Sequence, residues 1–105
     1  MRDPAQEHAL YAGLIRLHIL HHAAREGIFG LEIMAELARH GYRLSPGTLY
    51  PMLHGLERDG YLRSTERHHG GRIRRVYRAT ALGRQTLRAA KAKVRELFEE
   101  IFEEG

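Results

Sequence analysis

The segment from Leu44 to Glu57 constrains the fold of this chain more than any other part of the sequence. Ser45 is a favourable N-cap, and Pro46 suits the first position of a helix. Apolar residues then recur at helical spacing and would share one buried face: Leu49, Met52, Leu53 and Leu56. The segment predicts a short helix that is anchored to the core but has a bare N-terminus, which can approach phosphate or enter a DNA groove.

Length and composition are typical of one globular domain. The chain has 105 residues, of which 43% are hydrophobic and 29% are charged, so it can bury a single core and is not expected to be disordered. No apolar run is long enough to span a bilayer, and the N-terminus lacks the apolar stretch of a signal peptide. Because there is no cysteine, disulfides and thiolate metal sites are excluded. We expect a cytoplasmic protein without a membrane partner.

Charge is distributed unevenly along the chain. Between Arg58 and Arg95 there are twelve lysines and arginines but only two acidic residues, Asp59 and Glu66. The final segment, from Glu96 to the C-terminus, holds five glutamates and no basic residue. A basic middle favours a polyanionic partner, and nucleic acid is the usual one. The alternative is a solvated basic surface with no specific partner.

Two further helices are predicted before the opening segment. Leucines and isoleucines recur at helical spacing over residues 5–24, and Gly27 would end that helix. A second helix is predicted over residues 30–39, followed by Gly41. Its inward face is expected to hold Leu31, Met34, Leu37 and Ala38. Because a tight connection joins this helix to the one capped by Ser45, the pair forms a helix-turn-helix pattern.

The periodicity changes after Gly60. Residues 61–67 and 73–79 can form two strands, with the turn signal Gly70-Gly71 between them. This basic two-stranded ribbon directly follows the candidate recognition helix, which is the position of the wing in a winged helix-turn-helix. The predicted fold is therefore mainly α with a small β-wing.

A last helix is predicted from Thr80, as N-cap, to about residue 104. Its apolar stripe follows a winged unit that is already complete, so another surface must cover it. A second copy of the chain is the expected cover, with the first helix contributing. The expected dimer interface consists of Leu10, Leu14, Leu17, Leu87, Val94, Leu97, Phe98 and Ile101. The alternative is a helix that folds back on its own domain.

We accordingly divide the chain into a DNA-binding domain over residues 1–79, which includes the N-terminal helix, and a C-terminal dimerisation helix over residues 80–105.

Several segments together resemble the signature of PadR-type transcriptional regulators. They are residues 44–53, residues 56–62, the wing tip at 70–72 and residues 75–84. The single C-terminal helix is similar to the short-tailed branch of that family. The resemblance implies a homodimer with a winged helix-turn-helix in each subunit, which usually represses transcription at a palindromic operator. It also implies release from the operator when a small molecule or another signal binds near the dimer interface.

The residues expected to contact double-stranded DNA lie at the start of the Ser45 helix and in the wing. They are Arg43, Ser45, Gly47, Thr48, Tyr50, His54, Arg72, Arg74 and Arg75. Hydroxyls and guanidinium groups can bind phosphate, and arginines can also enter the minor groove. Since side chains alternate along a strand, Arg72 and Arg74 would face one way and Arg75 the other. Tyr50 could instead be a half-buried packing residue, and His54 an ordinary surface histidine.

Three histidines of the first helix depart from the aliphatic residues of many relatives. They are His18, His21 and His22, and the i, i+4 pair has the spacing of paired zinc ligands. A divalent metal would then need carboxylates such as Glu7 or Glu26, or residues of a partner chain. The alternative is that the histidines fill an interface and hydrogen-bond across it. They could also make dimer packing depend on pH.

The leading hypothesis is a dimeric DNA-binding regulator that binds an operator through its wing and the Ser45 helix. An unknown effector would release it from the operator. A metal-responsive regulator using His18, His21 and His22 is a second hypothesis, and a winged-helix protein–protein adaptor is a third. An enzyme is least favoured, because the sequence holds no cysteine, no glycine-rich nucleotide loop and no paired carboxylates in a plausible cleft. No cofactor is expected apart from that possible divalent metal.

Overall fold

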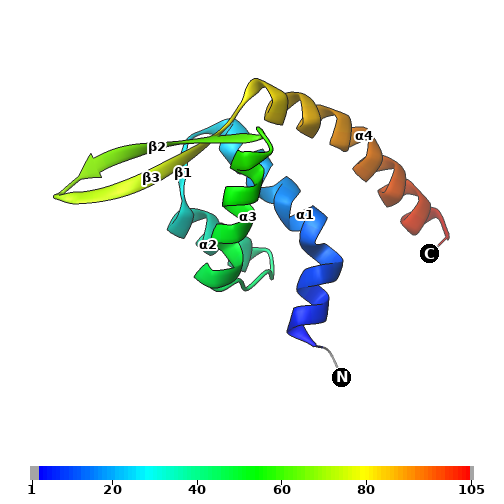
Figure 1. The fold of residues 1–105 in the computed structure, drawn as a ribbon. Helices are drawn as coiled ribbons and strands as arrows, with labels where there is room; N and C mark the ends of the chain where they lie inside the picture. The colour runs from blue at the N-terminus through cyan, green and yellow to red at the C-terminus, as the bar shows by residue number, and fades with distance from the viewer. Residues whose placement is uncertain (1–2, 105) are drawn as a thin grey trace.

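The computed structural model describes residues 3–104 and contains four helices and a small sheet (Figure 1). In chain order the elements are α1 (Pro4–Arg25), β1 (Ile28–Phe29), α2 (Gly30–Arg39), α3 (Pro46–Arg58), β2 (Leu62–His69), β3 (Arg72–Ala79) and α4 (Ala81–Glu104). Helices α1, α2 and α3 pack together, the β2–β3 hairpin projects from one end of this body, and α4 extends from the other (Figure 1). The predicted fold class, mainly α with a β-wing, is confirmed.

Helix α1 lies at the centre of the core. Asp3 caps it by accepting a hydrogen bond from the Ala5 N–H at 2.9 Å, which satisfies one of the free donors of the first turn. Ile15 and Ile19 are fully buried, one helical turn apart. They belong to the same core as Leu49 and Leu53 of α3.

Helix α2 has the predicted bounds, but its buried face differs from the expected one. Ile33 and Leu37 are buried, whereas Leu31 is 64% exposed and Ala38 is exposed as well. The predicted inward positions of Leu31 and Ala38 are therefore wrong. The buried side is set by Gly30, Ile33 and Leu37 at spacings of three and four, and Leu31 falls beside that face.

The sheet has three antiparallel strands in the order β1-β3-β2, and its first strand was not predicted. Strand β1 has two residues, too few to show a periodicity, and it pairs Ile28 with Tyr77 of β3. Strands β2 and β3 pair from Leu62 with Ala79 to His69 with Arg72, so the hairpin is longer than expected. Gly70 and Gly71 form its turn with φ of 56° and 78°, values that glycine adopts without steric cost.

The junction between the wing and α4 is tightly packed. Thr80 caps α4, accepting a hydrogen bond from the Gly83 N–H at 3.0 Å, while its hydroxyl donates to the carbonyl of Gly60. Gly83 is buried against the backbone of Tyr61, and a Cβ at position 83 would collide with the Tyr61 carbonyl oxygen. This contact fixes where α4 leaves the domain.

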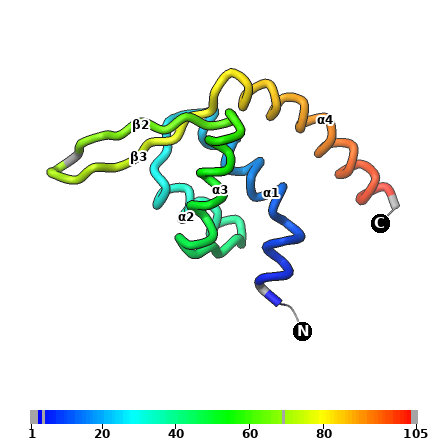
Figure 2. The backbone as a smooth tube through the Cα atoms, in the orientation of Figure 1, coloured from blue at the N-terminus to red at the C-terminus, as the bar shows by residue number. Residues whose placement is uncertain are grey.

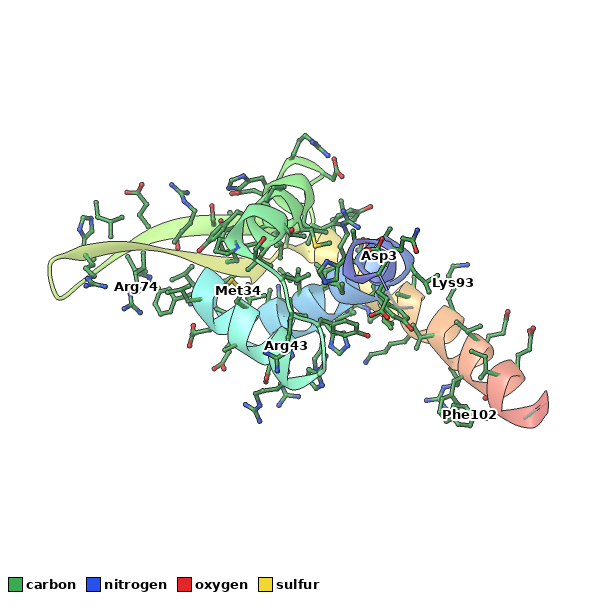
Figure 3. The ribbon with its side chains drawn as sticks, turned by 90° about the horizontal axis from the view of Figure 1, so that it is seen from below. Asp3, Met34, Arg43, Arg74, Lys93 and Phe102 are labelled. Carbon is green, nitrogen blue, oxygen red and sulfur yellow. The ribbon has the colours of Figure 1, made fainter. Side chains whose placement is uncertain are left out.

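Helix α4 then diverges from the rest of the chain, as the backbone tube shows (Figure 2). Leu87 is half-buried and packs against the core, but the later stripe residues Leu97, Phe98 and Ile101 are each 57% exposed. Figure 3 shows Phe102 at the free end of this helix, away from the domain. The distal half of α4 therefore presents an apolar face without cover from the described part of its own chain.

Replacing Gly83 with alanine should destabilise the protein by about 1–3 kcal/mol, because the new Cβ collides with backbone that cannot move aside. Gly55→Ala in α3 is the matched control, since its Cβ meets nothing closer than the Arg58 side chain at 3.6 Å. That helix-interior substitution should be neutral or stabilising by up to about 1 kcal/mol. Chemical denaturation of both variants at one protein concentration measures the difference, and equal stabilities would contradict the packing described for Gly83.

Candidate nucleic-acid interface

The first turn of α3 is open to solvent. Ser45 is the N-cap, but in this fully described turn its hydroxyl makes no cap hydrogen bond, contrary to the expected side-chain capping. Its carbonyl instead accepts from the N–H groups of Thr48 and Leu49 at 3.0 and 2.9 Å, and its hydroxyl lies 3.3 Å from the Thr48 Oγ1. Gly47 is exposed, and a Cβ there would come no closer than 3.8 Å to Ser45. Two hydroxyls and a bare glycine thus share one accessible helix start.

Tyr50 is half-buried and packs against the start of α2. A Cβ added at Gly30 would lie 2.5 Å from the Tyr50 hydroxyl oxygen, so the glycine makes room for the phenol. Tyr50 also lines a cleft of about 290 Å³ with Phe29, Arg72 and Arg74. The tyrosine is therefore first of all a packing residue, although its edge faces the cleft between the helices and the wing.

The wing arginines occupy both faces of the hairpin, as their alternation predicted. The Arg74 guanidinium lies over the Phe29 ring, 5.3 Å from the centroid, which is within cation–π range. Arg72 is exposed two residues before it on the same strand, and the two share the cleft with Tyr50. Figure 3 shows Arg74 standing off the hairpin and Arg43 on the connection before α3, where it is exposed.

Arg75 belongs to a hydrogen-bonded chain that the sequence reasoning missed. The Glu57 carboxylate at the end of α3 accepts from the Ser64 hydroxyl at 2.6 Å and from the Ser64 N–H at 3.1 Å. Arg75 donates to the Ser64 hydroxyl oxygen at 3.1 Å and pairs with Glu66 at 3.2 Å. This chain ties α3 to the wing, and it engages the Arg75 guanidinium at the protein surface, where the side chain is 48% exposed. The signal in the sequence was the Gly70-Gly71 turn, which sets a hairpin register that places Glu66 opposite Arg75.

His54 lies one turn after Tyr50 on α3 and is exposed, with the two ring centroids 6.3 Å apart. It therefore extends the accessible line that begins at Ser45. Ser45, Thr48, Tyr50 and His54 all lie on α3 or at its N-cap, and of these Tyr50 shares a cleft with Arg72 and Arg74 of the wing.

The histidines form a different group from the expected one. His18 and His22 of α1 meet His40, the C-cap of α2, and the ligand atoms of the three side chains all lie within 4.8 Å of one another. His21 lies outside this group and lines a cavity with Leu17 and Leu87 instead. A residue contributed by a second helix cannot be found from spacing along the first one.

Burial and charge act on the same histidines. Burial, followed by the neighbouring His40 and His22, lowers the pKa of His18, while Glu36 acts in the opposite direction. Burial also lowers the pKa of His22, again opposed by Glu36. Both shifts favour the neutral imidazole, whose nitrogen lone pair can coordinate a metal ion.

The expected dimer residues fall into two sets. Leu17 and Leu87 are half-buried and pack against the chain's own core, whereas the others are exposed: Leu10, Leu14, Val94, Leu97, Phe98 and Ile101. Between α1 and α4 lie two open cavities of about 570 Å³ each, which share Leu17, Ala90 and Val94 in their linings. The two helices thus border one continuous apolar surface.

Within residues 3–104, no helix is both long enough and apolar enough to cross a membrane.

A helix-turn-helix whose second helix is followed by a projecting two-stranded ribbon defines a winged-helix protein. Residues 19–89 match the model of the transcriptional regulator PadR-like family. The chain is also 55% identical over 87 residues to transcriptional regulator Rv3488 of Mycobacterium tuberculosis, a match that spans 83% of this chain and 81% of that protein. The chain belongs to the PadR-like family of transcriptional regulators, so the prediction of a regulator rather than an enzyme is confirmed.

Solved structures share the architecture. A PadR family transcriptional regulator from Eggerthella lenta is 29% identical, with a TM-score of 0.80 over 94% of this chain and 88% of that one. Bacillus subtilis PadR, solved in complex with operator DNA, is 19% identical, with a TM-score of 0.65 over 72% of this chain and 45% of that chain. The latter likeness is one of fold.

Ser64→Ala tests whether the chain of hydrogen bonds from Glu57 to Arg75 holds the wing on α3. The substitution removes the hydroxyl that bridges them, and we expect a loss of about 1–2 kcal/mol in stability, because one partner is a carboxylate. Amide exchange in β2 and β3 should also become faster. Thr65→Ala, the next and exposed residue of β2, is the control and should change exchange far less. If both variants behave alike, the link is not structural.

Proposed function

We propose that this chain is a dimeric, cytoplasmic repressor that binds a palindromic operator in double-stranded DNA. The observation that carries the proposal is the exposed start of α3, together with a hairpin whose exposed Arg72 and Arg74 share a cleft with Tyr50 of that helix. Membership of a regulator family and the fold shared with a PadR protein solved on operator DNA support it.

The helix start and the wing would have different tasks. Ser45 and Thr48 would donate hydroxyl hydrogen bonds to phosphate, and Gly47 would let the backbone approach the duplex. His54 would reach a base edge or phosphate further along the helix. Arg72 and Arg74 would bind phosphates or the minor groove, with Arg43 adding a phosphate contact. Arg75 would hold the wing in position rather than contact DNA, because its guanidinium is already hydrogen-bonded to Ser64 and Glu66.

The exposed stripe of α4, together with Leu10 and Leu14 of α1, would form the dimer interface. Apolar patches of this kind are rarely left open on a monomer. A two-fold dimer presents two recognition helices, and these read half-sites about one helical turn apart. An effector of small-molecule size would fit the cavities between α1 and α4, which lie where the two subunits would meet.

The DNA-binding proposal predicts a strong dependence of operator affinity on salt. After selection of bound sequences from random DNA, log K should fall against log salt by about 0.9 per neutralised phosphate. Replacing Arg72 and Arg74 together by alanine should weaken binding to all sequences and reduce this slope by about 2. Arg88→Ala, an exposed arginine on α4, is the matched control and should leave the slope unchanged.

Fluorescence anisotropy at several salt concentrations measures these slopes. A binding constant that is flat in salt, or a selection that enriches no sequence, would overturn the proposal and favour the protein–protein adaptor.

The dimer proposal predicts that a charge within the α4 stripe separates the subunits. Val94→Glu should shift the protein from dimer to monomer in analytical ultracentrifugation, because a carboxylate would be buried in the interface. Operator affinity should fall by about 100-fold, since each half-site is then bound independently. Ala92→Glu adds the same charge on another face of α4 and should remain a dimer. A wild-type monomer would falsify the interface.

A further inference from the structure

We infer that His18, His22 and His40 form a binding site for a borderline divalent cation of the Zn²⁺ class, and that its occupation alters DNA binding. The three side chains come from two helices, so tertiary packing rather than local spacing brings them together. The His18 and His40 rings stack with centroids 4.8 Å apart, and His22 and His40 lie 6.4 Å apart.

The distances are close to those of a metal site. All the ligand atoms lie within 4.8 Å of one another. Tetrahedral zinc with Zn–N bonds of 2.0–2.1 Å places its ligand atoms about 3.4 Å apart, so the widest pair must close by roughly 1.4 Å. His40 is exposed, and His18 and His22 are only half-buried. Rotation of these side chains can therefore bring the ligand atoms closer together by that distance.

The chemistry of the donors selects the ion. Three imidazoles favour zinc, cobalt, nickel or copper, whereas magnesium and calcium require oxygen ligands. Burial of His18 and His22 favours the neutral imidazole, which is the form that binds metal.

Glu36 supplies the negative charge near the site. Its carboxylate acts on both His18 and His22, and it lies one helical turn before His40 on α2. Glu36 is also paired with Arg39 at 3.6 Å, a contact it would have to leave to become a fourth ligand. The other titratable groups near the cluster are His21 and Arg25 of α1, and Tyr42 contacts His18 edge-on at 5.4 Å.

The site lies where α1 meets the end of α2, so a bound ion would affect how these two helices pack. A metal on these residues clamps α1 to the end of α2, the helix that packs against α3. Helix α1 also carries Leu10 and Leu14 of the proposed dimer surface. Occupation would therefore fix the angle between the dimer surface and the recognition helix, and this coupling rests on the proposed function.

Calorimetric titration of the tag-free, full-length protein with Zn²⁺ tests the site without DNA. We expect one ion per chain, and a loss of more than about 100-fold in affinity for His18→Ala and His40→Ala, beyond what outer-shell substitutions cause. His21→Ala is the matched control, because it removes a neighbouring histidine outside the cluster. His40→Cys should retain binding, since thiolate is also a zinc ligand.

Thermal melting with and without Zn²⁺ shows that the variants fold and gives a second readout. The wild-type melting temperature should rise with the ion, and that of His40→Ala should not. No binding by the wild type, or equal losses in His21→Ala and His40→Ala, would overturn the site.

Anisotropy on the selected operator then tests the coupling, with Zn²⁺ against a chelator. A shift in wild-type affinity that His40→Ala abolishes supports it. Equal affinity in both conditions overturns the coupling but leaves the calorimetric result standing, and failure to bind any DNA overturns the proposed function alone.

Discussion

The buried face of α3 is the constraint on which the rest of this structure depends. Leu49 and Leu53 are fully buried against the core that α1 and α2 build around them. Burial of a leucine contributes about 1.5–3 kcal/mol, so this face cannot be released without losing much of the stability of a small domain. Leu49 comes only three residues after Pro46, which anchors the helix from its first turn and leaves the opposite side of that turn in solvent. The same packing that holds the helix therefore also presents its start.

The wing takes its position from the same helix, at the opposite end. Glu57 accepts two hydrogen bonds from Ser64, and Ser64 in turn accepts one from Arg75. These bonds lie at the base of the hairpin, while its tip turns through Gly70 and Gly71 in open solvent. The base of the hairpin is thus held on α3 both by these polar contacts and by Leu62, Tyr77 and Ala79, which are buried in the same core as Leu49 and Leu53. Arg75 is engaged by these contacts, and Arg72, Arg74 and Arg78 are the other exposed arginines of β3.

The sequence predicted those features that depend on local periodicity and missed those that depend on contacts between elements. The helix over Pro46–Arg58 and the Gly70-Gly71 turn follow from capping, spacing and the conformations open to glycine. Strand β1 could not be found, because two residues have no period and its partner Tyr77 is nearly fifty residues away. The buried face of α2 was misplaced for a related reason, since Leu31 and Ile33 are both apolar and only packing decides which turns inward.

Helix α1 shows why the site residues are harder to predict than the fold. Its faces have three different surroundings. Ile15 and Ile19 are buried in the core, whereas Leu10 and Leu14 are exposed. His18 and His22 lie against His40, the C-cap of α2. A single 22-residue helix accommodates all three because successive residues turn by about 100°, so neighbouring positions in sequence face different partners. The sequence shows the three kinds of residue but not which partner each face receives. Since one helix carries all these faces, a ligand bound on one of them would also act on the elements that pack against the others.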